Sequence, residues 1–293
     1  MLFTASIVVD KERRLTDSDS DESEVESDAG AEDEDATLVF RSIPHVGGVN
    51  RIRAQILSDI SSPPPSPPEP YHVATFSETG KIHIFDIAPH LYTLQNPAEA
   101  GGMASTLSKT PQFTINSHGR AEGFALAWGP PIGSSSKRLL SGDIHSKIYL
   151  STLTPSGVST SSGAFASHTS SIEDLQWSPT EPTVFASCSA DRSMKVWDVR
   201  VKERKSVISV DGAHESDVNV LSWNQKTSYL MVTGGDEGGL KVWDLRNLKS
   251  LVSLSRWHKH GTDKEQGKRH YTFFSSDLQL AHRTNHLGRM ASN

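Results

Sequence analysis

Three side chains near the middle of the chain are of the types that a catalytic triad uses. His168, Ser187 and Asp191 stand close together in the sequence. In a serine hydrolase, a histidine takes the proton of the serine hydroxyl while an aspartate orients the imidazole ring. No serine of this chain lies in a Gly-x-Ser-x-Gly sequence, which forms the nucleophile elbow of one large hydrolase class. The triad therefore needs further support before it is accepted.

The same residue types recur farther along the chain. "ASCSADRSMKVWDVR" (residues 186–200) is nearly repeated by "VTGGDEGGLKVWDLR" (residues 232–246), 46 residues later. The second copy has His214, Thr233 and Trp243 where the first has His168, Ser187 and Trp197. A catalytic centre needs one copy, whereas a stack of similar structural units needs several. We interpret these residues as structural and predict no catalytic, cofactor-binding or metal-binding residues.

The repeat also predicts the elements that position these side chains. Weaker copies run from His118 to Ser151 and from Thr75 to Phe85, and all copies alternate apolar and polar residues between turns. A unit of roughly 40–50 residues with four short strands that ends in Trp-Asp is typical of a propeller blade. We predict an all-β WD-repeat β-propeller with about four recognisable blades. WD-repeat blades place a hydrogen-bonded tetrad at the positions of His168, Ser187, Asp191 and Trp197.

Composition narrows the class of protein. The single cysteine, Cys188, excludes an internal disulfide and fits a reducing compartment. The histidines lack the cysteine pairs or His-Glu-x-x-His spacing of zinc sites. No apolar stretch approaches the length of a membrane span. We expect a soluble intracellular protein that needs no cofactor and does not associate with membranes.

Charge is distributed unevenly. Residues 17–35, "DSDSDESEVESDAGAEDED", carry eleven acids and no lysine or arginine. Since the chain has a net charge of −6, the rest of it carries +5. Such a dense run repels itself and lacks apolar residues, so we expect it to be disordered. It is either a solubilising spacer or a polyanion mimic that binds basic partners, with Asp33, Glu34 and Asp35 next to the first blade.

The ordered series of motifs resembles a known family. The acidic run, "IPHVGGVNRIRA", "EGFALAW", "SIEDLQWSPTEPTVFASCSADRSMKVWD" and "HESDVNVLSWN" are similar to the glutamate-rich WD-repeat proteins. The resemblance covers about residues 17–250. It implies a non-enzymatic chaperone or scaffold of the nucleus and nucleolus that acts in pre-ribosomal complexes. Such proteins bind basic clients, namely a large-subunit ribosomal protein and histones, and direct nucleic-acid binding is not expected.

The resemblance weakens at both ends of the chain. Family members carry a longer N-terminal region with a helix, and they close as a seven-bladed ring. We therefore expect this chain to hold an incomplete part of such a ring. Its expected parts are an N-terminal remnant with the acidic segment (residues 1–40), the propeller blades (41–250) and an irregular C-terminal tail (251–293).

The loop that enters the innermost strand of each blade is the expected binding surface. Glu122, Glu173, Asp217 and Asn219 lie shortly before Trp128, Trp177 or Trp223. In the histone-binding relatives, acids at equivalent places face a basic histone tail. The resemblance implies that role for Glu122 and Glu173 and, less directly, for Asp217 and Asn219. Ordinary solvated turn residues are the alternative.

A second class of function stays open. "WDVR" and "WDLR" are also compatible with a substrate receptor or scaffold in a ubiquitin-ligase complex. The acidic run favours the chaperone, because a ligase scaffold does not require such a run.

Overall fold

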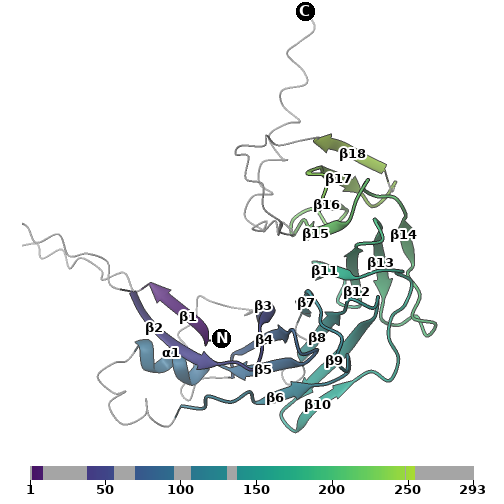
Figure 1. The fold of residues 1–293 in the computed structure, drawn as a ribbon. Helices are drawn as coiled ribbons and strands as arrows, with labels where there is room; N and C mark the ends of the chain where they lie inside the picture. Colours follow the sequence, from purple (N-terminus) through teal and green to yellow (C-terminus); the bar gives the residue numbers. More distant parts are fainter. Residues whose placement is uncertain are drawn as a thin grey trace, which may run out of the picture.

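Four antiparallel sheets of four strands each follow one another along an arc (Figure 1). The computed structural model describes residues 2–8, 38–55, 70–95, 107–130, 137–247 and 249–254. Each sheet is a blade, and the predicted all-β propeller arrangement of four blades is confirmed. The acidic run with Asp33, Glu34 and Asp35 lies outside the described residues, as does the expected tail from residue 255 onward.

Each blade is a meander of four consecutive strands whose first strand lies on the inside of the arc. Blade 1 contains β3 (Val49–Ala54), β4 (His72–Ser77), β5 (Ile82–Asp86) and β6 (Phe113–Ile115). Blade 2 contains β7 (Ala125–Trp128), β8 (Lys137–Gly142), β9 (Ile148–Thr154) and β10 (Gly157–Thr160). Blade 3 contains β11 (Ile172–Trp177), β12 (Val184–Ser189), β13 (Met194–Asp198) and β14 (Ile208–Val210). Blade 4 contains β15 (Val218–Trp223), β16 (Leu230–Gly235), β17 (Leu240–Asp244) and β18 (Lys249–Leu254).

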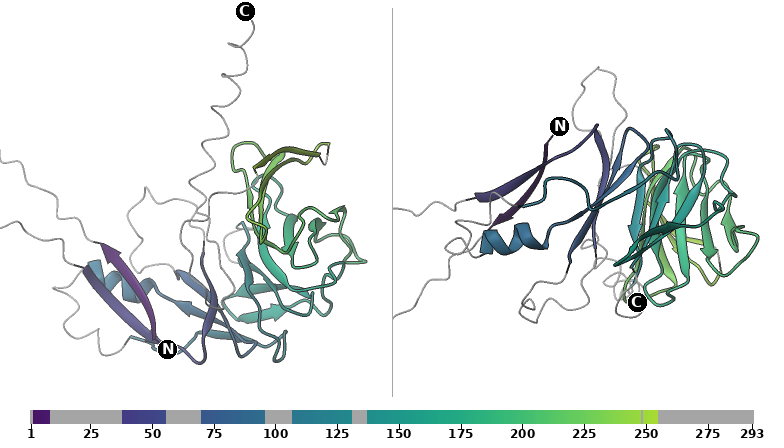
Figure 2. Two further views of the ribbon diagram at one scale, coloured as in Figure 1. Left: turned by 45° about the horizontal axis from the view of Figure 1, so that its top comes forward. Right: turned by 90° about the horizontal axis from the view of Figure 1, so that it is seen from below.

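Two further elements lie at the blade 1 end of the arc (Figure 2). The strands β1 (Leu2–Val8) and β2 (Leu38–Pro44) pair with each other as a two-stranded sheet. The single helix of the described residues, α1 (Ala88–Gln95), connects β5 to β6. Because β2 spans residues 38–44, the expected boundary between residues 40 and 41 falls inside a strand.

The C-terminal boundary also differs from the expectation. We expected an irregular tail from residue 251, but β18 continues to Leu254, which pairs with Leu240 at the far end of β17. The "KSLVSL" sequence does not alternate strictly between polar and apolar residues, so its strand signal was weak, but it pairs with β17 along one edge from Lys249 to Leu254. The blade therefore extends four residues beyond the expected limit.

The core consists of one apolar cluster between each pair of neighbouring blades. Between blades 2 and 3, for example, Leu140 and Ile148 meet Phe165, Phe185 and Trp197. Among the described residues no strand of one blade pairs with a strand of another, so the arc is held together by this packing and by single hydrogen bonds such as that from Trp128 Nε1 to the Arg53 carbonyl at 2.9 Å. Blade 1 packs against blade 2 on one face, and on the other face Val73 and Phe85 form a fourth apolar cluster with Ile43 of β2, which explains why all six residues of β4 are buried.

The turn between the second and third strands of every blade contains one residue with a left-handed backbone. These residues are Gly80 (φ 82°), Ser146 (φ 63°), Arg192 (φ 66°) and Gly238 (φ 80°). Glycine suits such a position because it has no Cβ to clash with the backbone. A Cβ at Gly80 would lie 2.7 Å from the carbonyl carbon of Arg120, in the loop that enters blade 2. Gly80 thus also permits close contact between two blades.

Comparing two glycines should separate backbone strain from steric conflict. Gly80→Ala and Gly238→Ala should each lose about 1 kcal/mol of unfolding free energy from backbone strain alone, since both place an L-residue at positive φ. Gly80→Ala should cost clearly more, because a Cβ at Gly238 meets no atom within 4 Å. Urea denaturation of both variants measures the difference. Equal losses would contradict the contact between the turn of blade 1 and the loop of Arg120.

Candidate protein-binding rim

A chain of hydrogen bonds joins four buried side chains in blade 3. Trp197 donates from Nε1 to Ser187 Oγ at 2.8 Å, and Ser187 Oγ lies 2.7 Å from His168 Nε2. On the other side of the ring, His168 Nδ1 lies 2.8 Å from Asp191 Oδ2. The Ser187 side chain is fully buried. A hydroxyl that is buried and bonded at both sides is not positioned to attack a substrate.

The direction of this chain follows from its two ends. The Asp191 carboxylate only accepts, so His168 donates from Nδ1 and its Nε2 accepts from the Ser187 hydroxyl. The Ser187 oxygen in turn accepts from the indole, and every member is satisfied. Burial lowers the pKa of His168 below its usual value, although Asp191 acts in the opposite direction. Burial would raise the Asp191 pKa, but hydrogen bonds from His168 and Ser193 hold it well below its usual value.

Blade 4 repeats the arrangement. Trp243 donates from Nε1 to Thr233 Oγ1 at 2.7 Å, and Thr233 Oγ1 lies 2.7 Å from His214 Nε2. His214 Nδ1 bonds to Glu237 Oε1. The longer glutamate thus occupies the role that Asp191 has in blade 3.

Blades 2 and 1 hold incomplete versions, and each uses a residue that sequence reasoning missed. In blade 2, His118 bonds to Ser141 Oγ at 2.8 Å and to Asp143 Oδ2 at 2.7 Å. Asp143 stands two residues before the position of Asp191, at the start of the same turn. In blade 1, His45 bonds to Thr75 Oγ1 at 2.8 Å and to the Gly47 carbonyl at 3.1 Å.

The distance along the chain hid His45. His168 and His214 each precede their hydroxyl partner by 19 residues, whereas His45 precedes Thr75 by 30. Residues 56–69, which fall between β3 and β4, account for this longer separation. Two features of the sequence could have indicated this pair: the strand "HVATFS", which contains Thr75, and the segment "PHVGG", which contains His45.

These histidines mark one edge of the arc. The loop before each innermost strand carries His45, His118, His168 or His214, and the turn between the second and third strands lies on the same edge. We call this edge the histidine rim. By tying the loop to the second and third strands, each chain of hydrogen bonds positions the start of the innermost strand. The loops between the first and second strands and between the third and fourth strands of each blade lie on the other edge, which we call the opposite rim.

The innermost strand of three blades begins with a β-bulge. The register shifts at Asn50, Glu173 and Asn219, and Phe124 has the equivalent position in blade 2. A bulge leaves one residue unpaired and directs its side chain away from the regular ladder. Glu173 and Asn219, both predicted to bind a partner, occupy this position and are half-buried.

Glu122 and Asp217 belong to a different row. The Glu122 carbonyl accepts from Ile144 N at 3.0 Å, and the Asp217 carbonyl accepts from Asp236 N at 2.9 Å. These two acids therefore lie two residues before the bulge position. The sequence contained the signal, since Glu122 precedes Trp128 by six residues whereas Glu173 precedes Trp177 by four. Glu122 also accepts from Asn50 Nδ2 at 3.0 Å, and Asn219 donates to Asp236.

Two arginines on the inside of the arc were not predicted as part of this surface. Arg51 in β3 donates to the carbonyls of Phe124 and Glu173, the latter at 3.2 Å. Arg53 Nη2 lies 3.6 Å from the carboxylate of Asp174. Burial raises the pKa of Asp174, while Arg51 and Arg53 act in the opposite direction. The inside of the arc near blades 1 to 3 is therefore not purely acidic.

The described residues contain no group of three or more histidine, cysteine, aspartate or glutamate side chains that could hold a metal ion. Among the same residues, no helix is long and apolar enough to cross a membrane.

Comparisons with known proteins agree with the repeat. The family model described as "WD domain, G-beta repeat" matches residues 159–198 and 205–244; each match covers the first three strands of blade 3 or blade 4, together with residues of the outermost strand of the blade before it. The chain is 42% identical over 61% of its length to ribosome assembly protein rrb1 of Schizosaccharomyces pombe, and the match covers 34% of that protein. It is 38% identical over 57% of its length to glutamate-rich WD repeat-containing protein 1 of Dictyostelium discoideum, covering 30% of that protein.

A more distant relative is histone acetyltransferase type B subunit 2 of S. pombe, with 27% identity over 60% of this chain and 36% of the relative. The resemblance inferred from the motifs is confirmed by these homologues and by the WD40 repeats. The chain spans about a third of the length of the relatives it matches.

Removing the indole donor of blade 3 should destabilise the protein. Trp197→Phe leaves Ser187 Oγ without its donor, so we expect a loss of about 1–3 kcal/mol in unfolding free energy. In a Ser187→Ala background the same change should cost less, because the acceptor is already gone. Urea denaturation of the two single variants and the double variant measures this coupling. Strictly additive losses would argue against the hydrogen bond.

Stability should fall as the pH decreases from about 7 to 5. The lowered pKa of His168 means that the unfolded chain binds a proton more readily than the native state below pH ~6.5. Acid therefore favours unfolding, and the lowered pKa of Asp191 adds the same sign at still lower pH. His168→Gln should reduce the difference between urea midpoints at pH 5 and 7. His145→Gln, on an exposed turn, is the control and should leave it unchanged.

Proposed function

We propose that this protein is a non-catalytic WD-repeat chaperone or scaffold of ribosome biogenesis that binds basic clients. The clients are a large-subunit ribosomal protein and histones, and the binding groups are the acidic run and the histidine rim. On this proposal the protein works in the nucleus and nucleolus as part of pre-ribosomal complexes. Homology to a ribosome assembly protein is the observation that carries the proposal.

The charge of the histidine rim supports a basic client. The rim loops of blades 1, 2 and 3 hold equal numbers of acidic and basic residues: Glu78 and Lys81; Glu122, Asp143, Arg120 and Lys147; Asp191 and Arg192. Glu173, at the bulge of β11, adds one acid to blade 3. The rim loops of blade 4 hold five acids and no lysine or arginine: Asp211, Glu215, Asp217, Asp236 and Glu237. Negative charge on this rim is thus concentrated over blade 4.

Part of that charge is already engaged within the protein. Asp211 pairs with Lys195 at 3.0 Å, and Glu237 bonds to His214. Glu215 is exposed and Asp217 is half-exposed beside the bulge at Asn219. We therefore assign the client contact on the rim chiefly to blade 4, with Glu122 and Glu173 contributing from blades 2 and 3. Complementary charge of this kind mainly raises the association rate and the specificity.

A scaffold of a ubiquitin-ligase complex is the alternative function. Its docking residues would be the arginines after each Trp-Asp pair, Arg200 and Arg246. Both already form two-point ion pairs with Asp198 and Asp244 in the same loops, with shortest distances of 2.6 Å. A partner would have to compete with these local carboxylates, which makes the alternative weaker than the chaperone.

Affinity capture at low and high salt, followed by mass spectrometry, tests the choice between the two functions. A chaperone for basic clients should retain ribosomal proteins or histones at low salt and lose them at high salt, since exposed charges are screened. Recovery of ubiquitin-ligase subunits instead, at both salt concentrations, would favour the alternative.

Removing acids should weaken client binding in two separable ways. Replacing the acids of residues 17–35 by serine and glycine should lower the affinity for purified core histones and flatten its salt dependence. Glu215→Gln with Asp217→Asn should have a smaller effect of the same sign. Fluorescence anisotropy at several salt concentrations measures the affinity for core histones and its salt dependence.

A matched control removes two acids elsewhere. Glu181 and Glu203 are exposed in loops on the opposite rim, so Glu181→Gln with Glu203→Gln changes the net charge equally. An equal loss of affinity in this control would mean that net charge alone, and not the histidine rim, attracts the client.

A further inference from the structure

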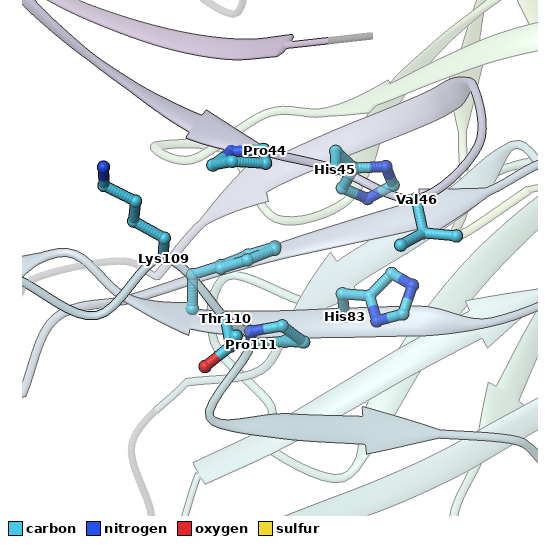
Figure 3. Close-up of a pocket in the computed structure, with 8 residues that line it drawn as sticks. Pro44, His45, Val46, His83, Lys109, Thr110 and Pro111 are labelled. Atoms are coloured by element: carbon cyan, nitrogen blue, oxygen red, sulfur yellow. The ribbon is translucent and has the colours of Figure 1, made fainter.

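Blade 1 has a small pocket on the side that faces away from blade 2, and none of the functions above uses it (Figure 3). Its volume is about 250 Å³. One wall is the segment that leaves β2, the other is the segment that leads into β6, and β5 lies behind them. The lining residues are Pro44, His45, Val46, His83, Phe85, Lys109, Thr110 and Pro111.

Blade 3 shows one way in which this space is closed. There, Ser206 N donates to Ser167 Oγ at 3.1 Å and so joins the two walls. The tetrad histidines and the pairing of the third and fourth strands align Ser167 with Pro44 and Ser206 with Pro111. Pro44 has no hydroxyl to accept a hydrogen bond and Pro111 has no N–H to donate one. The two prolines therefore prevent the closing contact.

A smaller side chain at the back of the pocket adds to the space. Phe85 stands at the position of Trp197, ten residues after the hydroxyl of its blade. In blade 3, the larger indole fills this region and donates to Ser187. In blade 1, Phe85 is smaller and has no N–H, so Thr75 lacks that donor. The pocket thus lies where a complete blade holds an indole.

The lining also indicates the charge of a ligand. Among the residues that line the pocket there is no carboxylate, while Lys109 is exposed at its mouth. Burial lowers the pKa of His83, and the neighbouring His45 and Lys81 lower it further. His83 Nε2 is buried and has no hydrogen-bond partner among the described residues. The wall is therefore aromatic and neutral, and the mouth is positive.

Size restricts the ligand to a single side chain. Cofactors and drug-sized molecules occupy about 300–1,000 Å³, whereas a benzene ring fits in about 150 Å³. Two imidazoles, a phenyl ring and two prolines provide flat surfaces on which an aromatic ring packs well. We propose that this pocket binds an aromatic side chain, next to an acidic residue, in an extended segment of a partner protein.

A short peptide provides the direct test. Acetyl-Glu-(fluorotryptophan)-Glu-amide, titrated with the full chain and followed by fluorine NMR, should shift and broaden with a Kd of about 1 mM or tighter. The unlabelled peptide with alanine in place of the aromatic residue should not displace it. Displacement by the alanine peptide would show that charge alone is recognised, which would overturn the proposal.

Phe85→Trp should fill the pocket from inside. The new indole can donate to Thr75 as Trp197 does to Ser187, so the urea midpoint should rise while peptide affinity falls at least about tenfold. Unchanged affinity in a folded Phe85→Trp variant would exclude this pocket as the site.

A second variant does not depend on repacking the blade. Lys109 is exposed, so Lys109→Glu should fold normally, weaken the Glu-flanked peptide and favour the same peptide flanked by lysines. An unchanged preference would remove Lys109 from the site and overturn the charge assignment. Self-association that Phe85→Trp abolishes would assign the pocket to a second copy of this chain instead of a partner.

Discussion

The buried chain from tryptophan through hydroxyl and histidine to carboxylate is the interaction on which the arrangement of each complete blade depends. It links the loop at the blade's entrance to the second and third strands, which are distant from that loop in sequence. Burial makes an unpaired member costly, so the four side chains hold one another in a single arrangement. The innermost strand starts from this loop, so fixing the loop also fixes the position of the bulge on the histidine rim.

The blades differ in how complete their chain of buried hydrogen bonds is. Blade 3 has the complete chain of hydrogen bonds. In blade 2, Ser151 stands at the position of the indole, and its hydroxyl lies 2.8 Å from that of Thr160. Blade 1 has neither the indole nor the carboxylate. Because Phe85 is smaller than a tryptophan, a pocket remains beside it. The repeats that are weakest as structural units thus leave the most room for other contacts.

Charge follows a similar division. Over blades 1 to 3 the acids of the histidine rim are balanced by neighbouring cations, and Arg51 and Arg53 add positive charge on the inside of the arc. The loops over blade 4 hold five acids and no lysine or arginine, and the cations that reach them come from strands: Lys195 pairs with Asp211, and Lys241 donates to the Ala213 carbonyl. On the proposed function, a basic client attracted by the acidic run would contact the histidine rim chiefly over blade 4, where Glu215 and Asp217 lie.

The sequence by itself determined the architecture, because short strands that end in Trp-Asp and repeat with His168, Ser187 and Trp197 at set positions suit only a propeller blade. It also indicated the homologues, through an ordered series of motifs. Only the tertiary structure showed that His45 and Asp143 join such chains, since loops of different length bring them to equivalent places. It likewise gave a physical meaning to the different spacings of Glu122 and Glu173 from Trp128 and Trp177, because the bulge in β11 directs Glu173 away from the regular ladder, and the sequence does not show the bulge.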